Sequence, residues 1–302
     1  MPAPKSFTKI MTDETLLETA QHGSLSFPLQ YYYEDIWDFD FHCVDWHWHP
    51  ELEFIYVATG SATCLLDQEK VIVTAGQGIL INSRVIHRLD ASSSTTIPNI
   101  VFSPTLLAAE ESLLYQRYIE PVLKSSLTHL VLSPETSWQA VCLQKLREVF
   151  ACLEKEEIDV MRVTITLLCA WHDIYHHCAN DGSLSQIRQD STAQIRIRLM
   201  LQYIQEHYRE TIRLEDIAAA VHLGKSTVMQ IFHQHIHMSP IAYLIQYRVK
   251  RAAHLLRTTE KSVAAIADET GFESSTYFCR KFKELYRMTP TIYRKSNCMP
   301  CR

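Results

Sequence analysis

The C-terminal third of the chain contains one helical pattern twice. Residues 214–233 and residues 263–283 each begin with an alanine-rich segment and end with an aromatic one. Ile217-Ala218 and Ile266-Ala267 are 49 residues apart, whereas Phe232 and Phe282 are 50 apart, so the second copy has one extra residue in its turn. The alanines allow two helices to approach closely, and Gly271 supplies the left-handed backbone that such a turn requires. The repeat therefore predicts two helix-turn-helix units.

A single long helix is predicted between the two units, over residues 239–256. Ser239 is a favourable N-cap and Pro240 a favourable first helical residue. Thr289-Pro290 repeats this start in short form after the second unit.

The distribution of charge separates this region from the rest of the chain. The net charge of the whole chain is −5. Residues 191–302 hold 17 Lys and Arg against 9 Asp and Glu, a net charge of +8, which leaves −13 on the first 190 residues. A basic region of this kind is typical of a surface that faces a polyanion.

The first third has a β pattern. Between residues 26 and 102, short β-rich runs at 53–58, 62–66, 70–74 and 78–81 are separated by turn residues such as Gly60 and Gly76. This spacing predicts an antiparallel sandwich or barrel. His47 and His49 are two residues apart and should therefore point to the same side of a strand.

The same region resembles the cupin family, whose pattern H-x-H-x3-E-x6-G, followed by a second Gly-rich turn and a later His, matches His47, His49, Glu53, Gly60 and His87. In metal-binding cupins the three His and the Glu are ligands, and such a set suits a divalent transition metal. The alternatives are a small-ligand pocket or hydrogen-bonded residues with no ligand. We expect an organic ligand and neither a metal nor a cofactor, with these ligand-binding residues: His47, His49, Glu53, Tyr56 and His87.

The middle of the chain, residues 104–180, is predicted to be helical. Apolar residues recur at helical spacing, Ser133-Pro134-Glu135 indicates a helix start, and a third helix is expected over 160–178. These helices could pack against the β domain or against a second subunit. Residues 180–191 read as a linker, and the histidines His172, His176 and His177 suit a helix C-terminus better than a metal site.

The repeated C-terminal array is similar to the AraC/XylS family of bacterial transcription regulators, in which a cupin-like ligand domain commonly precedes the DNA-binding domain. The resemblance rests on the order Ile-Ala, turn, Arg280-x-Phe282-Lys283, then Thr289-Pro290…Tyr293. It implies an α+β multidomain protein: a cupin-like β-barrel (double-stranded β-helix) over 1–103, a helical linker and dimerisation region over 104–189, and an all-α double helix-turn-helix domain over 190–302. Two recognition helices would then enter successive major grooves of DNA.

The first unit departs from the family pattern, because His222, Gln230, His233 and His237 stand where the family usually has Gly, Arg, Lys and Gly. Arg287 likewise replaces a Gly in the second unit. His tolerates a left-handed backbone at some cost, so the fold should survive. The helical spacing predicts these outward, DNA-binding residues: Lys225, Ser226, Thr227, Gln230, His233, Ser274, Ser275, Thr276, Cys279, Arg280 and Lys283. Arg can read guanine and Gln adenine, although a phosphate contact, plain solvation or, for Arg280, a structural salt bridge is an alternative.

The sequence thus favours a ligand-responsive, sequence-specific transcription regulator that has no catalytic residues. We expect a cytoplasmic homodimer that binds double-stranded promoter DNA and an unknown small-molecule effector, with RNA polymerase as a further candidate partner and no membrane contact. No apolar run reaches the ~20 residues of a membrane helix. Nine scattered cysteines, including the pair Cys298 and Cys301, read as reduced thiols. The alternative is a metal-dependent cupin enzyme fused to a DNA-binding module.

Overall fold

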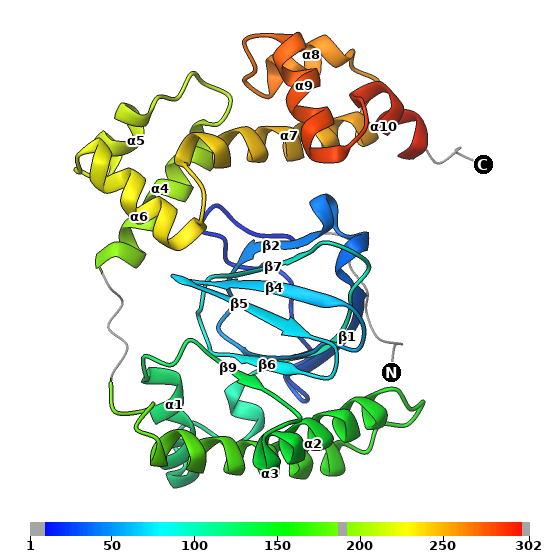
Figure 1. Cartoon of the computed structure of the whole chain (residues 1–302), viewed down its shortest axis with the longest axis vertical. Coiled ribbons are helices and arrows are strands. Elements are labelled where there is room, and N and C mark those ends of the chain that lie inside the picture. The colour runs from blue at the N-terminus through cyan, green and yellow to red at the C-terminus, as the bar shows by residue number, and fades with distance from the viewer. Residues whose placement is uncertain (1–9, 187–191, 298–302) are drawn as a thin grey trace. The chain divides into compact units, whose positions relative to one another are not determined.

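A computed structural model describes residues 10–186 and 192–297 of the chain (Figure 1). The chain divides into two compact units, Met1–Ser191 and Thr192–Arg302. The first unit contains all the strands and the second is helical. The division falls at the end of the predicted linker, where the charge of the sequence changes sign.

The strands of the first unit form two antiparallel sheets. One sheet has the order β1-β8-β3-β6-β9 and the other the order β2-β7-β4-β5, so the strands make a two-sheet sandwich and not one continuous closed barrel. The strands are β1 (Leu29–Asp35), β2 (Cys43–His47), β3 (Leu52–Tyr56), β4 (Ser61–Leu66), β5 (Glu69–Thr74), β6 (Gly78–Ile81), β7 (His87–Ala91), β8 (Thr96–Phe102) and β9 (His129–Leu132). The runs predicted at 53–58, 62–66, 70–74 and 78–81 correspond to β3, β4, β5 and β6.

Alternation along β3 shows how the five-stranded sheet serves two cores. Ile55 belongs to the core between the two sheets, together with Leu66 and Leu89. Leu52 and Phe54 point the other way, into a second core that the helices complete. A strand buried on both faces explains why β3 reads as a nearly continuous apolar run.

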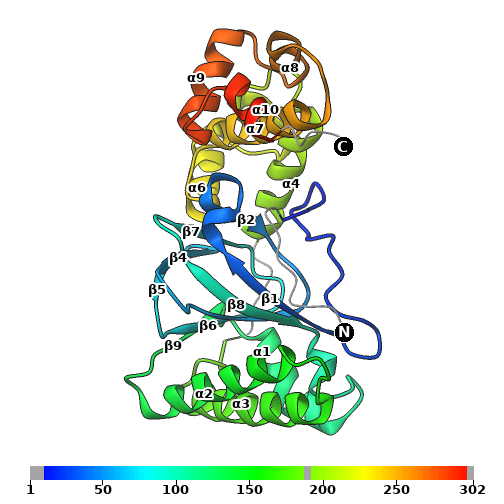
Figure 2. The same ribbon diagram turned by 90° about the vertical axis from the view of Figure 1, so that its right-hand side faces the viewer.

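Helices α2 (Ser137–Leu153) and α3 (Val160–Asn180) cover the outer face of this sheet (Figure 2). Their contact with the sheet is close, since a Cβ added to Gly78 would lie 2.9 Å from Leu143 Cδ2. The two helices were predicted, but α2 begins at Ser137 and not at Ser133-Pro134, because Thr136 is its N-cap.

The rest of the middle region is less helical than predicted. Residues 115–119 form a π-helical turn that leads into the short α1 (Glu120–Lys124). Strand β9 then pairs with β6, so the five-stranded sheet takes its edge strand from beyond residue 103. The domain boundary between residues 103 and 104 therefore remains a prediction from the sequence.

The second unit consists of seven helices among its described residues. They are α4 (Thr192–His207), α5 (Leu214–Ala220), α6 (Lys225–Ile236), α7 (Pro240–Thr258), α8 (Val263–Glu269), α9 (Ser275–Tyr286) and α10 (Pro290–Asn297). Helices α5–α6 and α8–α9 are the two predicted helix-turn-helix units, and α7 is the predicted connecting helix with Ser239 as its N-cap.

The turn residues adopt the backbone that the sequence required. Gly271 has φ +81°, and its missing Cβ would lie 2.6 Å from the Tyr208 carbonyl oxygen. His222, His237 and Arg287, which replace family glycines, are left-handed as well, with φ values of 52°, 55° and 58°. The fold therefore keeps the turns despite the substitutions.

Neither a membrane-length apolar helix nor a disulfide occurs in the described ranges, where seven cysteines are free thiols. The pair Cys298 and Cys301 lies outside these ranges, as does part of the predicted linker.

Candidate functional site

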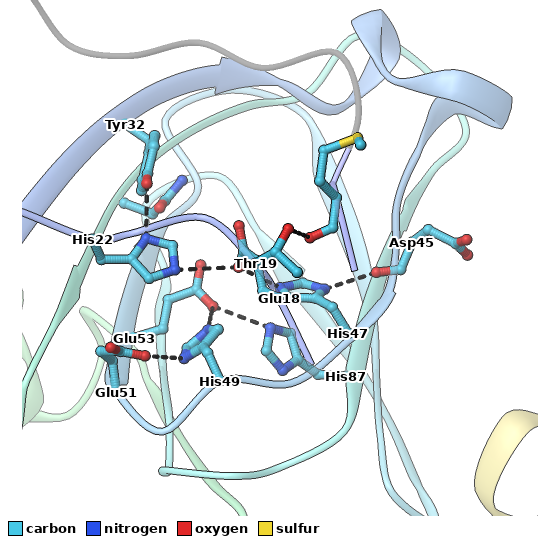
Figure 3. A network of polar contacts seen from close by, with 12 residues as sticks. Glu18, Thr19, His22, Tyr32, Asp45, His47, His49, Glu51, Glu53 and His87 are labelled. Carbon is cyan, nitrogen blue, oxygen red and sulfur yellow. Dashed lines mark hydrogen bonds and ion pairs between the residues drawn. The ribbon is translucent and has the colours of Figure 1, made fainter. Parts of the chain in front are cut away.

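Four of the residues predicted to bind a ligand meet inside the sandwich (Figure 3). His47 ends β2 and pairs in register with His87, the first residue of β7. Glu53 faces them from β3, and His49 lies in the connection between β2 and β3. One potential ligand atom from each of the four residues lies within 4.8 Å of the others, and all four residues are buried.

Hydrogen bonds to the backbone fix the orientation of two of these imidazoles. His47 Nδ1 lies 2.7 Å from the Asp45 carbonyl oxygen, and His87 Nδ1 lies 2.9 Å from that of Val85. Because a carbonyl oxygen only accepts, each Nδ1 must donate a proton. Each ring therefore directs Nε2 toward the centre of the cluster, an arrangement that is common for metal-ligating histidines.

The charges in the cluster follow from burial and from neighbouring groups. Burial lowers the pKa of His47 well below its ordinary value, and the imidazoles of His87 and His49 add to this effect. For Glu53, burial works to raise the pKa, but the imidazoles of His49 and His87 lower it well below the ordinary value. The cluster therefore contains a neutral His47 imidazole and an ionised Glu53 carboxylate near neutral pH.

Two further polar residues reach the cluster from the chain before β1. Glu18 Oε2 lies 3.9 Å from His47 Nε2 and 3.3 Å from His22 Nε2. His22 Nδ1 in turn lies 2.8 Å from the Tyr32 hydroxyl. Glu18 and His22 are not identifiable from the sequence, because they lie in an irregular segment with neither a periodic pattern nor a motif.

Tyr56 lies apart from the cluster. It packs with the core between the five-stranded sheet and the helices. Glu53 and Tyr56 are three residues apart on one strand, so their side chains lie on opposite faces of the sheet. This corrects its predicted place in the ligand-binding set.

The space that remains inside the sandwich is small. The cavity beside Glu18, His22, His47, His49 and Glu53 has a volume of about 20 Å³. This is enough for one water molecule or one ion, whereas pockets for organic ligands typically have ~300–1,000 Å³. Three imidazoles and a carboxylate that converge on such a space fit a divalent transition-metal ion, so His47, His49, Glu53 and His87 could hold one.

The first helix-turn-helix unit presents a polar face on α6. The predicted residues Lys225, Ser226, Thr227, Gln230 and His233 are all exposed, whereas Val228, Ile231 and Phe232 are buried. The Lys225 ammonium lies 2.8 Å from Glu215 Oε1, so an acidic neighbour offsets its charge.

The second unit presents a more basic face on α9. Ser274, Ser275, Thr276, Arg280 and Lys283 are exposed and Cys279 is half-buried, while Phe278 and Phe282 fill the core. The Ser274 side chain accepts a hydrogen bond from the Tyr277 backbone N–H and caps the helix. The Arg280 side chain is 65% exposed, and its Nε lies 3.9 Å from Glu284 Oε1. An exposed ion pair of this length contributes little to stability, so it gives Arg280 no structural role.

Two family models match the chain. The model of a helix-turn-helix domain matches residues 217–296, and the model of a cupin domain matches residues 43–100. The matches cover both units that the sequence motifs pointed to.

Several curated proteins resemble most of the chain. An uncharacterized HTH-type transcriptional regulator, YdeC, from Bacillus subtilis (strain 168) is 28% identical over 94% of this chain and 98% of the relative. The melibiose operon regulatory protein of Escherichia coli (strain K12) is 27% identical over 82% of this chain and 83% of the relative. Among solved structures, a transcriptional regulator with an AraC-type DNA-binding domain from Chromobacterium violaceum is 25% identical over 36% of this chain and 96% of that chain, with a TM-score of 0.34.

Proposed function

Because this chain belongs to the AraC/XylS family of transcription regulators and has an N-terminal cupin domain, we propose which of its residues read DNA and which bind the effector. The family makes the protein a ligand-responsive, sequence-specific DNA-binding regulator with two helix-turn-helix units. The exposed residues of α6 and α9 are the proposed DNA contacts. Glu53 and the three histidines of the buried cluster are the proposed effector site.

The observation that carries the proposed DNA interface is the pair of exposed polar helix faces on a unit of net charge +8. Two recognition helices on one unit should read two short DNA motifs about one helical turn apart. The test is selection of bound duplexes from a random DNA library with the full-length protein. Enrichment of two motifs separated by ~10 base pairs supports the proposal, whereas a single motif or no enrichment contradicts it.

The same geometry argues for regulation instead of catalysis. A metal-dependent cupin enzyme needs space for its substrate beside the metal, and the cavity of about 20 Å³ is too small for an organic molecule. We therefore propose that the protein is not an enzyme. Its buried cluster would bind the effector without converting it chemically, and binding alone would change the regulator's activity.

The outer face of α3 supports a homodimer. Met161 and Ile165 are 73% and 54% exposed on the side of this helix that faces away from the sheet. These two apolar side chains share one face of the helix and form a small patch that a protein partner could cover, and we propose a second copy of the chain as that partner. As a regulator of transcription the protein would act in the cytoplasm, and RNA polymerase is its proposed further partner at promoter DNA.

A further inference from the structure

A second cavity of the first unit, here called the outer groove, opens on the outside of the sandwich. Its volume is about 820 Å³, within the ~300–1,000 Å³ that is typical of pockets for organic ligands. Part of its lining comes from the β2–β3 and β6–β7 connections, which contribute Pro50, Ser83 and Arg84. The rest comes from the chain between β8 and β9, which includes the π-helical turn at 115–119 and α1 (Figure 1). Single π-helical turns are frequent at functional sites.

Arg84 brings a positive charge to the outer groove from a strained backbone. Its φ is +61°, a left-handed conformation that is uncommon for residues other than Gly. The Arg84 N–H donates to the His49 carbonyl oxygen at 2.8 Å, which holds this conformation. Beside it, the Ser83 hydroxyl donates to the Pro50 carbonyl oxygen at 2.6 Å. Backbone strain of this kind is concentrated at functional sites, and here it fixes where the Arg84 side chain leaves the chain.

Carboxylates gather in the part of the outer groove around Tyr115. Burial raises the pKa of Tyr115, and the carboxylates of Glu110 and Glu120 raise it further because they lie close to its hydroxyl. Glu120 also forms an ion pair with Lys124, one turn further along α1, so these two charges offset each other. Glu110 is an exposed carboxylate. Arg84 and Glu110 therefore contribute one charge of each sign from different segments of the lining.

The balance of charge indicates the class of molecule that the outer groove suits. A purely anionic or purely cationic ligand would match either Arg84 or Glu110 and meet a like charge at the other, which is unfavourable. A molecule with a carboxylate at one end and an ammonium at the other matches both through charge-assisted hydrogen bonds. Tyr115 and Leu123 add apolar surface for side chains, and the volume leaves room for more than one amino-acid residue.

We propose that the outer groove binds a short peptide with free termini, whose carboxylate pairs with Arg84 and whose ammonium pairs with Glu110. This site is separate from the buried cluster, and it does not depend on the proposed effector site. The peptide is thus a second signal that the regulator receives.

Hydrogen bonds connect the lining of the outer groove to the start of the linker. The Asn82 side-chain amide, from the β6–β7 connection, donates to the carbonyl oxygens of Val122 and Leu127, each at 2.8 Å, and so ties this connection to the end of α1. The Ser126 N–H donates to the Gln186 carbonyl oxygen at 2.7 Å, within the segment that leads to the second unit. A peptide that orders α1 should therefore also order the backbone at Ser126.

The first test incubates the full-length protein with a library of tripeptides and identifies by mass spectrometry those retained on ultrafiltration. We expect tripeptides with free termini to be retained, and the same library with acetylated N-termini and amidated C-termini to be retained about tenfold less or weaker still, since two charge-assisted contacts are lost. Equal retention of both libraries, or retention of neither, would overturn the proposal. Retention of uncharged sugars and of no peptide in a parallel incubation would overturn the ligand class.

The second test assigns the two termini with variants, by calorimetric titration of a retained tripeptide. Arg84→Asn and Glu110→Gln should each weaken binding about tenfold. Asn suits the left-handed backbone at position 84. The matched controls Arg117→Asn and Glu111→Gln, which are exposed on the same stretch of chain but do not line the outer groove, should bind like the wild type.

The same titrations with singly capped tripeptides separate a contact from a general loss of structure. Amidation of the C-terminus should weaken binding to the wild type but not further to Arg84→Asn, and acetylation of the N-terminus should behave likewise with Glu110→Gln. Additive losses in both pairs would overturn the assignment of the termini. Glu110→Gln alters only an exposed side chain, so it keeps the test decisive if circular dichroism shows that Arg84→Asn is misfolded.

The third test measures hydrogen exchange of the Ser126 amide with and without a retained tripeptide. Exchange should become slower with the peptide in the wild type and in Glu111→Gln, but not in Glu110→Gln at the same peptide concentration. An amide that does not respond while calorimetry shows binding would overturn the connection to the linker. The DNA selection described above is independent of all three tests.

Discussion

Arg280 and Gln230 occupy matching places on the two recognition helices, and they differ in charge. Arg280 is 65% exposed and can clamp a phosphate or read guanine, whereas neutral Gln230 releases no counterion from DNA. We predict that Arg280→Ala weakens DNA binding by about 1–3 kcal/mol, and more than Gln230→Ala does. Fluorescence anisotropy at physiological salt measures both, and circular dichroism checks that both variants are folded. Equal losses would contradict the dominance of the second helix.

Gly271 and Gly224 make a matched pair for stability. A Cβ at Gly271 would lie 2.6 Å from a backbone oxygen at φ +81°, while one at Gly224 would meet no atom within 4 Å. Gly271→Ala should therefore lower the free energy of unfolding by at least ~1–2 kcal/mol. Gly224→Ala should change it by less than about 1 kcal/mol. Denaturant unfolding checks the difference, and a larger loss at Gly224 would refute the argument.

At the scale of elements, the features predicted from the sequence are those with a regular spacing of residues or a recognisable motif. The spacing of His47, His49, Glu53 and His87 identified the cluster, because the residues of a strand alternate between two faces. The same rule shows why Tyr56 was misplaced: an odd spacing from Glu53 reverses the face. The helix-turn-helix units were predicted almost completely, since each turn is formed by local residues such as Gly271 and His222.

The elements that were missed depend on contacts distant in sequence. Strand β9 has only four residues, His129–Leu132, and becomes a strand by pairing with β6. Glu18 reaches the cluster through bonds to Trp48, which lies 30 residues further along the chain. No local pattern encodes such a pairing, so only the folded chain shows it.

Helix α3 carries the prediction for dimerisation. Ile165→Glu places a charge on the exposed apolar face of α3 and should weaken dimerisation at least tenfold, or about 1.4 kcal/mol. Ile72→Glu is the control, because Ile72 is similarly exposed, at 59%, but lies on β5. Sedimentation equilibrium measures the dimer constant. A dimer that is weakened only by Ile72→Glu would place the interface on the sheet.

For the whole molecule, the opposite charges of the two units predict strong salt dependence. The second unit has a net charge of +8, so DNA binding releases counterions from phosphates. The affinity of the full-length protein should fall by roughly 10³–10⁵ between 50 and 200 mM salt if about 6–10 phosphates are contacted. Titrations at several salt concentrations give the slope directly. A flat response would show that charge contributes little to binding.

The double role of β3 has a consequence for genetics. Strand β3 carries Glu53 on its inner face and Leu52 and Phe54 on the face toward the helices, and Leu143 of α2 approaches Gly78 on β6, the strand that pairs with β3. A screen for mutants that regulate without their effector should therefore recover two classes of alleles. One class alters the cluster itself. The other lies at helix positions such as Leu143, about 90 codons away in the gene, and acts by displacing β6 and, through it, the paired strand β3.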